Sequence, residues 1–127
     1  MGNAMLKSFL VATSLICLTT LAAAQQPGPI VVLVKVFPAA GREDELQALY
    51  FKRLEFLRKA EPDATFHLHR SVKEPSTFLW YEVYPSQAAY DNHLKVVMAN
   101  FRKEFGPTPD GIIAKPSESE TFNELGR

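Results

Sequence analysis

The chain has 127 residues, of which 46% are hydrophobic and 22% are charged, a composition typical of one ordinary globular domain and not of a disordered chain. Its 14 basic and 14 acidic side chains balance, and the basic residues are interleaved with acidic ones along the sequence. Because a nucleic-acid-binding protein normally presents a basic face, this balance excludes nucleic acid as an expected partner.

The first 24 residues have the pattern of an export signal. Lys7 precedes an apolar run from Phe9 to Leu21, and three alanines, residues 22–24, follow it. This order is typical of a cleaved secretory signal, and the run is shorter than the about 20 residues that a membrane span needs. We therefore expect a periplasmic or secreted protein with no membrane attachment after cleavage, an uncleaved anchor being the alternative. Cys17, the only cysteine, lies in this run, so we expect no disulfide in the mature chain.

The mature chain is expected to begin with a linker, residues 25–29, and a strand. Residues 30–37 (IVVLVKVF) are continuous, β-branched and bounded by prolines, which indicates a strand covered on both faces. After a turn at residues 38–41, the acidic residues 43–45 favour the start of a helix of about four turns. Its apolar side chains recur at helical spacing and form one stripe: Leu46, Leu49, Tyr50, Leu54 and Leu57.

A hairpin of two strands, residues 64–71 and 77–84, is predicted after Glu61-Pro62-Asp63 ends that helix. Alternation divides each strand between two faces. In the first strand His67 and His69 share a face. In the second, one face carries Phe78, Trp80, Glu82 and Tyr84, and the other carries Leu79, Tyr81 and Val83.

A second helix is predicted from Ser86, a plausible N-cap, to the Gly106-Pro107 pair. His93 falls on its buried side. A short fourth strand over residues 111–115 is expected to stop at Pro116, and residues 117–127 have the composition of a polar tail.

This order, β-α-β-β-α-β, predicts a ferredoxin-like α+β domain over residues 30–116, with a four-stranded antiparallel sheet and two helices on one face. The strands carry apolar side chains on both faces, and no third layer remains in the chain to cover the second one. We therefore expect a homodimer in which sheet packs on sheet.

Three segments carry a resemblance to a known family: Glu61-Pro62-Asp63, the hairpin HLHRSVKEPSTFLWYEVY, and EVYPSQAAYDNHL, in which Glu82, Ala88, Tyr90 and His93 match the family pattern. With them, residues 30–116 resemble the antibiotic biosynthesis monooxygenases, dimeric α+β barrels that include small quinol-oxidising enzymes. The chain departs from the family at His67, where an aromatic residue is common. It also has VVMANF where many members carry a second histidine.

The resemblance implies an exported monooxygenase of quinol-like or polyphenolic aromatics that uses dioxygen and no cofactor. His93 is then the expected base, because histidine exchanges a proton near neutral pH, with Glu82 or His67 orienting it. A dry aromatic pocket is expected from Phe78, Trp80, Tyr81 and Phe101. Relatives of this kind also include isomerases and haem-degrading enzymes, and a non-catalytic dimer that binds a small molecule is the alternative from another class.

Structural interpretations of the same residues stay open. His93 could be a core histidine bonded to a backbone group or a carboxylate. Glu82 could anchor the turn into the second helix, with His93, Arg70 or a backbone amide as its partner. His67 and His69 point the same way, as two metal ligands can, but no third ligand is evident and no metal is expected.

Overall fold

The computed structural model describes residues 28–126, so the expected export signal lies outside the described residues. Its elements, in chain order, are β1 (Ile30–Pro38), α1 (Glu43–Ala60), β2 (Thr65–Arg70), β3 (Phe78–Tyr84), α2 (Gln87–Asn92), the π-helix η1 (His93–Val97), α3 (Met98–Phe105) and β4 (Ile113–Asn123). Within residues 28–126, no helix combines the length and the apolar character that crossing a bilayer requires.

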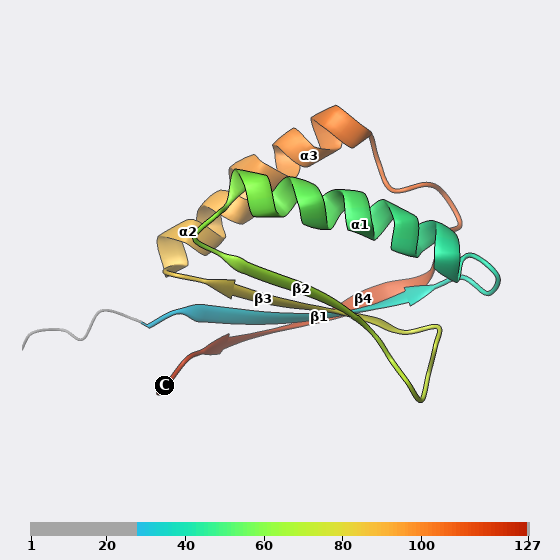
Figure 1. The fold of residues 1–127 in the computed structure, drawn as a ribbon, viewed down its shortest axis with the longest axis horizontal. Helices are drawn as coiled ribbons and strands as arrows, with labels where there is room; N and C mark the ends of the chain where they lie inside the picture. Colours follow the sequence, from blue (N-terminus) through green and yellow to red (C-terminus); the bar gives the residue numbers. More distant parts are fainter. Residues whose placement is uncertain (1–27, 127) are drawn as a thin grey trace, which may run out of the picture.

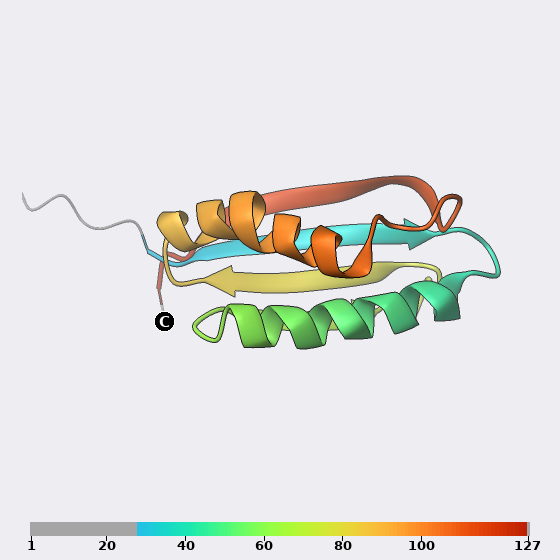
Figure 2. The same ribbon diagram turned by 90° about the horizontal axis from the view of Figure 1, so that it is seen from above.

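The four strands form one antiparallel sheet in the order β2-β3-β1-β4, and the helices cover one of its faces (Figure 1). Seen from above, α1 lies along the β2 side of the sheet, and the α2 to α3 segment runs beside it over the centre (Figure 2). The predicted α+β architecture and the β-α-β-β-α-β order are therefore confirmed.

The core lies between the helices and the covered face of the sheet. The predicted stripe of α1 supplies Leu46 and Leu57, both 0% exposed, and β3 supplies Trp80 at 1%. Fully burying a side chain of this size stabilises the fold by about 1.5–3 kcal/mol relative to leaving it exposed. Ser86 accepts a hydrogen bond from the backbone N–H of Ala89, which confirms it as the N-cap of α2.

The second helix is not uniform, although it ends at Phe105 close to the predicted stop. Its middle turn, η1, is a π-helix in which the backbone N–H of Met98 donates to the carbonyl of His93, five residues earlier. The wider turn inserts one extra residue into the helix between His93 and Met98. Single π turns of this kind often occur at functional sites.

The fourth strand is longer than predicted. β4 pairs with β1 from Pro38↔Ile113 to Ile30↔Asn123, so the expected stop at Pro116 and the expected polar tail are both wrong. β4 is an edge strand, where a proline that donates no hydrogen bond is tolerated, and the register shifts beside it, between Lys35 and Phe37. Backbone pairing, and not apolar side chains, extends this strand.

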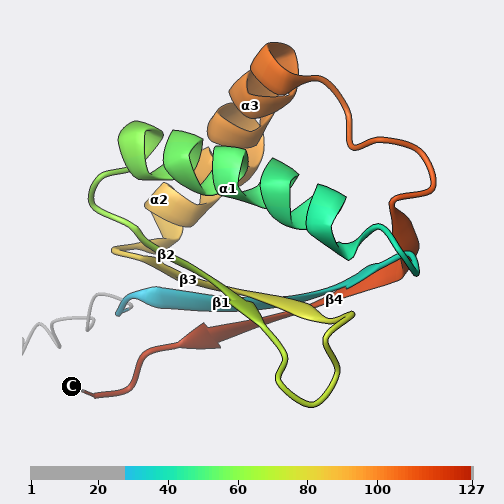
Figure 3. The same cartoon turned by 45° about the vertical axis from the view of Figure 1, so that its right-hand side comes forward.

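None of the helices between residues 28 and 126 covers the second face of the sheet (Figure 3). We call this face, which carries Leu33, Lys35, Leu79, Tyr81 and Val83 along β1 and β3, the open face. The aliphatic and aromatic side chains among these are only partly buried, in contrast to the covered face of the same two strands.

Candidate functional site

The covered face of the sheet holds the only two polar residues that are buried within residues 28–126, and both were expected in the site. His93 is 3% exposed at the start of η1, and Glu82 is 3% exposed in β3. Buried ionisable groups are costly unless they are hydrogen-bonded, so the partners of these two side chains decide what the site can do.

His93 is paired with Glu61, the residue that directly follows α1. Its Nδ1 lies 2.7 Å from Oε2 of Glu61, and the side chains are 3% and 9% exposed. The backbone of Glu61 is fixed by a hydrogen bond from its N–H to the carbonyl of Leu57. The interpretation of His93 as a buried histidine with a carboxylate partner is confirmed, and that carboxylate comes from 32 residues earlier in the chain.

Glu82 has a different partner. The hydroxyl of Tyr84 donates to Oε2 of Glu82 at 2.7 Å, because residues two apart on a strand share a face. None of the three partners considered for Glu82, which were His93, Arg70 and a backbone amide, is the one found. The expectation that Glu82 orients His93 through a hydrogen bond is therefore wrong, and Glu82 acts on the imidazole only through its charge.

Burial dominates the ionisation of the His93–Glu61 pair. It raises the pKa of Glu61 to about 7 and lowers the pKa of His93 to about 4, the latter against the opposing influence of the Glu82 charge. Burial, followed by the Glu82 charge, also raises the pKa of Tyr84. Near neutral pH the imidazole is therefore neutral, while Glu61 passes between its acid and its carboxylate.

The protonation of Glu61 decides which ring nitrogen of His93 can act as a base. When Glu61 is a carboxylate, Nδ1–H of His93 donates to it and Nε2 carries a free lone pair. When Glu61 is protonated, its hydroxyl donates to Nδ1 and the ring proton moves to Nε2. In the part of the chain that the structure describes, Nε2 has no hydrogen-bond partner.

Arg53 of α1 lies in the same neighbourhood. Its guanidinium carbon is 5.1 Å from the centroid of the Trp80 ring and 6.0 Å from that of Phe101, and its Nη2 is 3.5 Å from Sδ of Met98. Its charge contributes to the lowered pKa of His93. Arg53 Nε and the indole Nε1 of Trp80 are buried without a hydrogen-bond partner among residues 28–126. Arg53 is thus a cation with one N–H donor, Nε, that no described residue accepts.

The expected aromatic pocket is only partly assembled. Phe78 and Trp80, each 1% exposed, and Phe101, 8% exposed, all lie on the covered side of the sheet. Tyr81 lies on the open face, because successive residues of a strand alternate between faces, so it cannot line the same space within one protomer. The rings that instead surround the imidazole are those of Tyr84 and Phe66, at centroid distances of 5.0 and 6.0 Å.

His67 is also separated from His93, because it lies on the open face of β2. Its ring is stacked on that of His69 at 6.1 Å and lies 6.1 Å from that of Tyr81. The prediction that His67 orients His93 is therefore wrong within one protomer. Among residues 28–126, no group of three or more histidine, cysteine, aspartate or glutamate side chains is placed to hold a metal ion.

A cavity of about 190 Å³ reaches the pair from the carboxylate side. It is lined by Glu61, Pro62 and Asp63 after α1, and by Pro85, Ala89 and Asn92 around α2, among others. This places the Glu61 end of the pair next to a space large enough for solvent.

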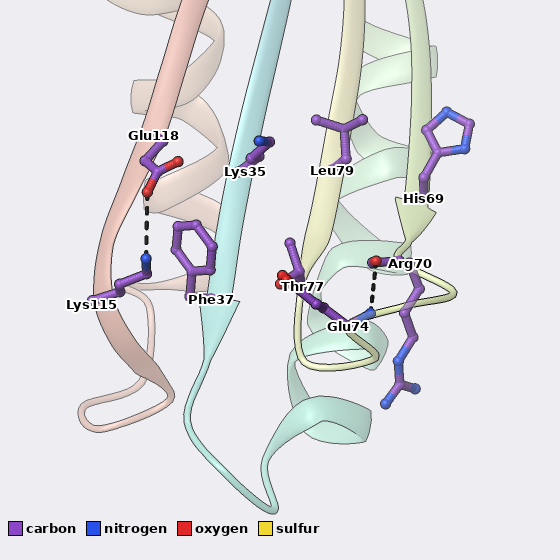
Figure 4. A pocket seen from close by; sticks show the side chains of 10 residues that line it. Lys35, Phe37, His69, Arg70, Glu74, Thr77, Leu79, Lys115 and Glu118 are labelled. Atoms are coloured by element: carbon purple, nitrogen blue, oxygen red, sulfur yellow. Dashed lines mark hydrogen bonds and ion pairs between the residues drawn. The ribbon is translucent and has the colours of Figure 1, made fainter.

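A larger cavity of about 510 Å³ lies on the open face, where Figure 4 shows the helices behind the sheet. Its lining includes Lys35, His69, Leu79 and Lys115. The ammonium group of Lys115 lies 3.7 Å from the ring centroid of Phe37 and 3.4 Å from Oε1 of Glu118. This cavity contains none of the buried polar residues of the covered face.

Sequence reasoning missed two members of the site. In the sequence, Glu61 is recognisable only as part of the segment that ends a helix. Arg53 is recognisable only as one of several charged residues on a helix surface. Neither residue type nor spacing marks them as a pair or cluster with His93. The resemblance quoted Glu61-Pro62-Asp63, but as a family motif and not as a partner of the histidine.

Comparison with known proteins identifies the family of this chain. Residues 29–97, more than half of the chain, match the family described as antibiotic biosynthesis monooxygenase. No curated protein matches the chain.

Several solved structures share the fold. One is a protein of Caulobacter crescentus CB15, provisionally named an antibiotic biosynthesis monooxygenase. It is 19% identical, with a TM-score of 0.66, over 79% of this chain and 92% of that one. A Nitrosomonas europaea protein with the same provisional name is 19% identical, with a TM-score of 0.63, over 79% and 93%. Rv0793 from Mycobacterium tuberculosis is 20% identical, with a TM-score of 0.61, over 78% and 97%. The matched family and the shared fold place this chain in the antibiotic biosynthesis monooxygenase family.

Proposed function

We propose that the protein is an exported, cofactor-independent monooxygenase of small quinol-like or polyphenolic aromatic compounds, with dioxygen as the second substrate. The observation that carries the proposal is the buried His93–Glu61 pair on the covered face, in a chain of the monooxygenase family. A neutral imidazole that is fixed by a carboxylate on one nitrogen is a competent general base at the other.

The protein's own part in the reaction is to remove one proton. Nε2 of His93 accepts the proton of the substrate hydroxyl, and the electron pair of that O–H bond stays on the oxygen. Glu61 accepts Nδ1–H and stabilises the imidazolium that forms, which lies among the rings of Tyr84 and Phe66. Exclusion of water from these buried groups strengthens the interaction between the two charges.

The redox steps then belong to the substrate. The phenolate passes one electron to dioxygen, and the resulting aryloxyl radical and superoxide combine at a ring carbon that bears hydrogen. The ring peroxide loses that hydrogen as a proton while its O–O bond breaks, which yields a quinone and water. One phenol and one dioxygen thus give one quinone and one water, and no external reductant is needed.

The active form is proposed to be a homodimer through the open face. Partly buried apolar side chains lie together along its two central strands, and a second copy would remove them from water. Leu33→Glu places a charge in the middle of this surface. We expect sedimentation at micromolar concentration to show a dimer for the unaltered protein and a monomer for the variant. If the unaltered protein sediments as a monomer, the proposed dimer is wrong.

Oxygen uptake tests the proposed chemistry. The mature protein, without added metal or flavin, is incubated with a panel of hydroquinones and naphthols in an oxygen electrode cell, with the heat-denatured protein as the control. We expect dioxygen consumption above the rate of autoxidation for at least one compound, with one quinone formed per dioxygen. Uptake no faster than autoxidation across the panel would contradict the proposal.

A non-catalytic dimer that binds a small molecule is a second candidate, and one observation favours it. The cavity of about 510 Å³ on the open face is larger than the one beside Glu61 and lies apart from His93. In that case a ligand would bind without any dioxygen consumption, and its affinity would be insensitive to replacement of His93.

A further inference from the structure

The open face carries different ionisable side chains at its two edges. At the β2 edge, His67 and His69 are two residues apart and both exposed, and their rings are stacked at a centroid distance of 6.1 Å. At the β4 edge, Glu118 and Glu120 are also two residues apart and exposed. Imidazoles that gain a positive charge in acid are thus separated from carboxylates by the two central strands, β3 and β1.

The register of the strands places these residues in two rows across the sheet. In the first row, His67 is paired with Tyr81 of β3. Leu33 of β1 is paired with Tyr81 on one side and with Glu120 on the other. Each row therefore has a histidine at one end and a carboxylate at the other. The second row runs from edge to edge in the order His69, Leu79, Lys35 and Glu118 (Figure 4).

The ends of both rows lack strong partners within one protomer. Among residues 28–126, no side-chain hydrogen bond or ion pair involves His67, His69 or Glu120. Glu118 has an ion pair with Lys115 at 3.4 Å, but the two side chains are 61% and 56% exposed. Ion pairs exposed to this extent contribute little to stability. The histidines and carboxylates of the two edges can therefore pair with groups of another molecule.

Symmetry restricts how two copies can stack through the open face. The two-fold axis lies between the sheets and runs either across the strands or along them. An axis across the strands places each strand on its own copy, so Glu118 and Glu120 would face the same carboxylates of the partner, which like charges disfavour. An axis along the strands reverses the order β2-β3-β1-β4, so β2 of each copy lies on β4 of the other and the rows face each other.

We propose that the open face binds a second copy of this chain in this second orientation, with His67 facing the partner's Glu120 and His69 facing the partner's Glu118. The proposal rests on the homodimer of the proposed function and assigns the orientation of its two copies. In the centre, the apolar side chains of β1 meet those of the partner's β3 and leave water. Because the axis repeats both contacts, the dimer has four histidine–carboxylate pairs.

This orientation makes the dimer tighter in mild acid. Histidine gains its charge as pH falls through about 6.5, whereas glutamate stays ionised above about pH 5. Association therefore takes up protons, and the attraction is lost as pH rises above about 6.5. Helix α1 packs on the other side of β2. On the open side, the charged or titratable groups of the protomer around the two histidines, none of a type that titrates between pH 5.5 and 7.5, are Lys35, Arg70, Glu74 and Tyr81.

Sedimentation equilibrium measures the dissociation constant of the dimer, Kd, at about pH 5.5 and 7.5. The ionic strength is constant, and EDTA removes any metal ion that the two histidines could share. We expect Kd of the unaltered protein to be about tenfold lower at the acidic pH, the sum of four partly exposed pairs.

Matched variants assign this change to the two edges. His67→Gln combined with His69→Gln keeps polar side chains that cannot gain charge, so we expect Kd to be independent of pH. Glu120→Gln removes two of the four pairs and should reduce the change to about threefold. Glu104→Gln removes an exposed carboxylate from α3, on the helix layer, and should keep the tenfold change. Circular dichroism checks the fold of each variant.

A second pair of substitutions tests the orientation itself. His67→Lys combined with His69→Lys gives the β2 edge a positive charge at both pH values. In the proposed orientation this edge faces carboxylates, so we expect the variant to dimerise at pH 7.5 as tightly as the unaltered protein does at pH 5.5. With the axis across the strands, the lysines would face each other. Dissociation of this variant would therefore overturn the inference.

Failure of this inference differs from failure of the proposed function. A Kd that is equal at both pH values, or a tenfold change that survives in the double glutamine variant, refutes the pairs and leaves the proposed homodimer standing. A monomer at both pH values refutes the inference together with the homodimer, and leaves the open face to another partner. Dioxygen uptake, which tests the chemistry of His93 on the covered face, is a separate measurement.

Discussion

The two faces of one strand, β3, differ in almost every physical property. On the covered face, Trp80, Glu82 and Tyr84 are at most 3% exposed, and a carboxylate and a phenol share a hydrogen bond of 2.7 Å. On the open face, Tyr81 and its neighbour in the adjacent strand, His67, are at least partly exposed, and within residues 28–126 neither has a side-chain hydrogen bond. Two tyrosines of one strand, Tyr84 and Tyr81, therefore lie in two different environments on its opposite faces.

This difference shows why residue type alone is a poor guide to the site. The chain has three histidines, of which two lie on the open face and one is buried. Only the buried one has a carboxylate partner and a pKa lowered to about 4 by burial. A low-dielectric environment strengthens electrostatic interactions, so the covered face is where proton chemistry is expected. The predictions below compare matched residues on the two faces.

Replacement of His93 has the largest expected effect. His93→Gln can still hydrogen-bond Glu61 but cannot accept a proton, so we expect a loss of about 10²–10⁴-fold in kcat for hydroquinone oxidation, measured by oxygen uptake. The matched variant His69→Gln on the open face should retain its activity. Equal activity of the two variants would mean that burial does not distinguish the catalytic histidine.

Loss of one hydroxyl should separate the two faces in stability. Tyr84→Phe removes the donor to the buried Glu82 carboxylate, and we expect the free energy of unfolding to fall by about 1–3 kcal/mol. Tyr81→Phe removes a hydroxyl from the open face of the same strand and should change it by no more than about 0.5 kcal/mol. Urea denaturation of both variants gives the two values, and similar losses would contradict the comparison.

Removal of the charge of Glu61 should change the pH dependence. Because the pKa of Glu61 is raised to about 7, the unaltered enzyme should gain kcat/KM as pH rises through about 7, where Nε2 of His93 becomes free. Glu61→Gln can accept Nδ1–H but has no proton to lose. We expect its activity to be about tenfold lower and flat across this range. A variant that keeps the rise would show that another group titrates.

The last effect concerns how stability depends on pH, and it is small in the unaltered protein. Because the pKa of Glu61 is raised from 4.5 to about 7, its contribution to the free energy of unfolding falls as pH rises through this range. Because the pKa of His93 is lowered from 6.5 to about 4, its contribution to the free energy of unfolding increases as pH rises through that range. The two nearly cancel between about pH 4.5 and 6.5. In His93→Gln only the first remains, so its free energy of unfolding should fall by up to about 1.4 kcal/mol per pH unit. A urea midpoint series from pH 5 to 7 checks this, and a flat series would contradict the assignment.

Local patterns were enough to predict the framework of the fold. The β-branched run of β1, the apolar stripe of α1, the alternation of β3 and the N-cap at Ser86 are all found where they were expected. Each depends on residues close together in the chain, which fix backbone periodicity and the face that is buried. A fourth strand was predicted, but its extension over residues 117–123 was not, because these residues carry no apolar alternation and only their pairing with β1 defines them as strand.

The sequence by itself determined the element order, the core residues of the covered face and the burial of His93. Only the tertiary structure decided which carboxylate that histidine meets, that Arg53 lies over Trp80, and that His67 lies on the face of the sheet away from His93. Alternation along the strand had already separated Tyr81 from Trp80. The physical reason is distance along the chain. Periodicity specifies the direction of a side chain relative to its own helix or strand, whereas the contact of the end of α1 with η1, 32 residues later, depends on how the two helices pack on the sheet.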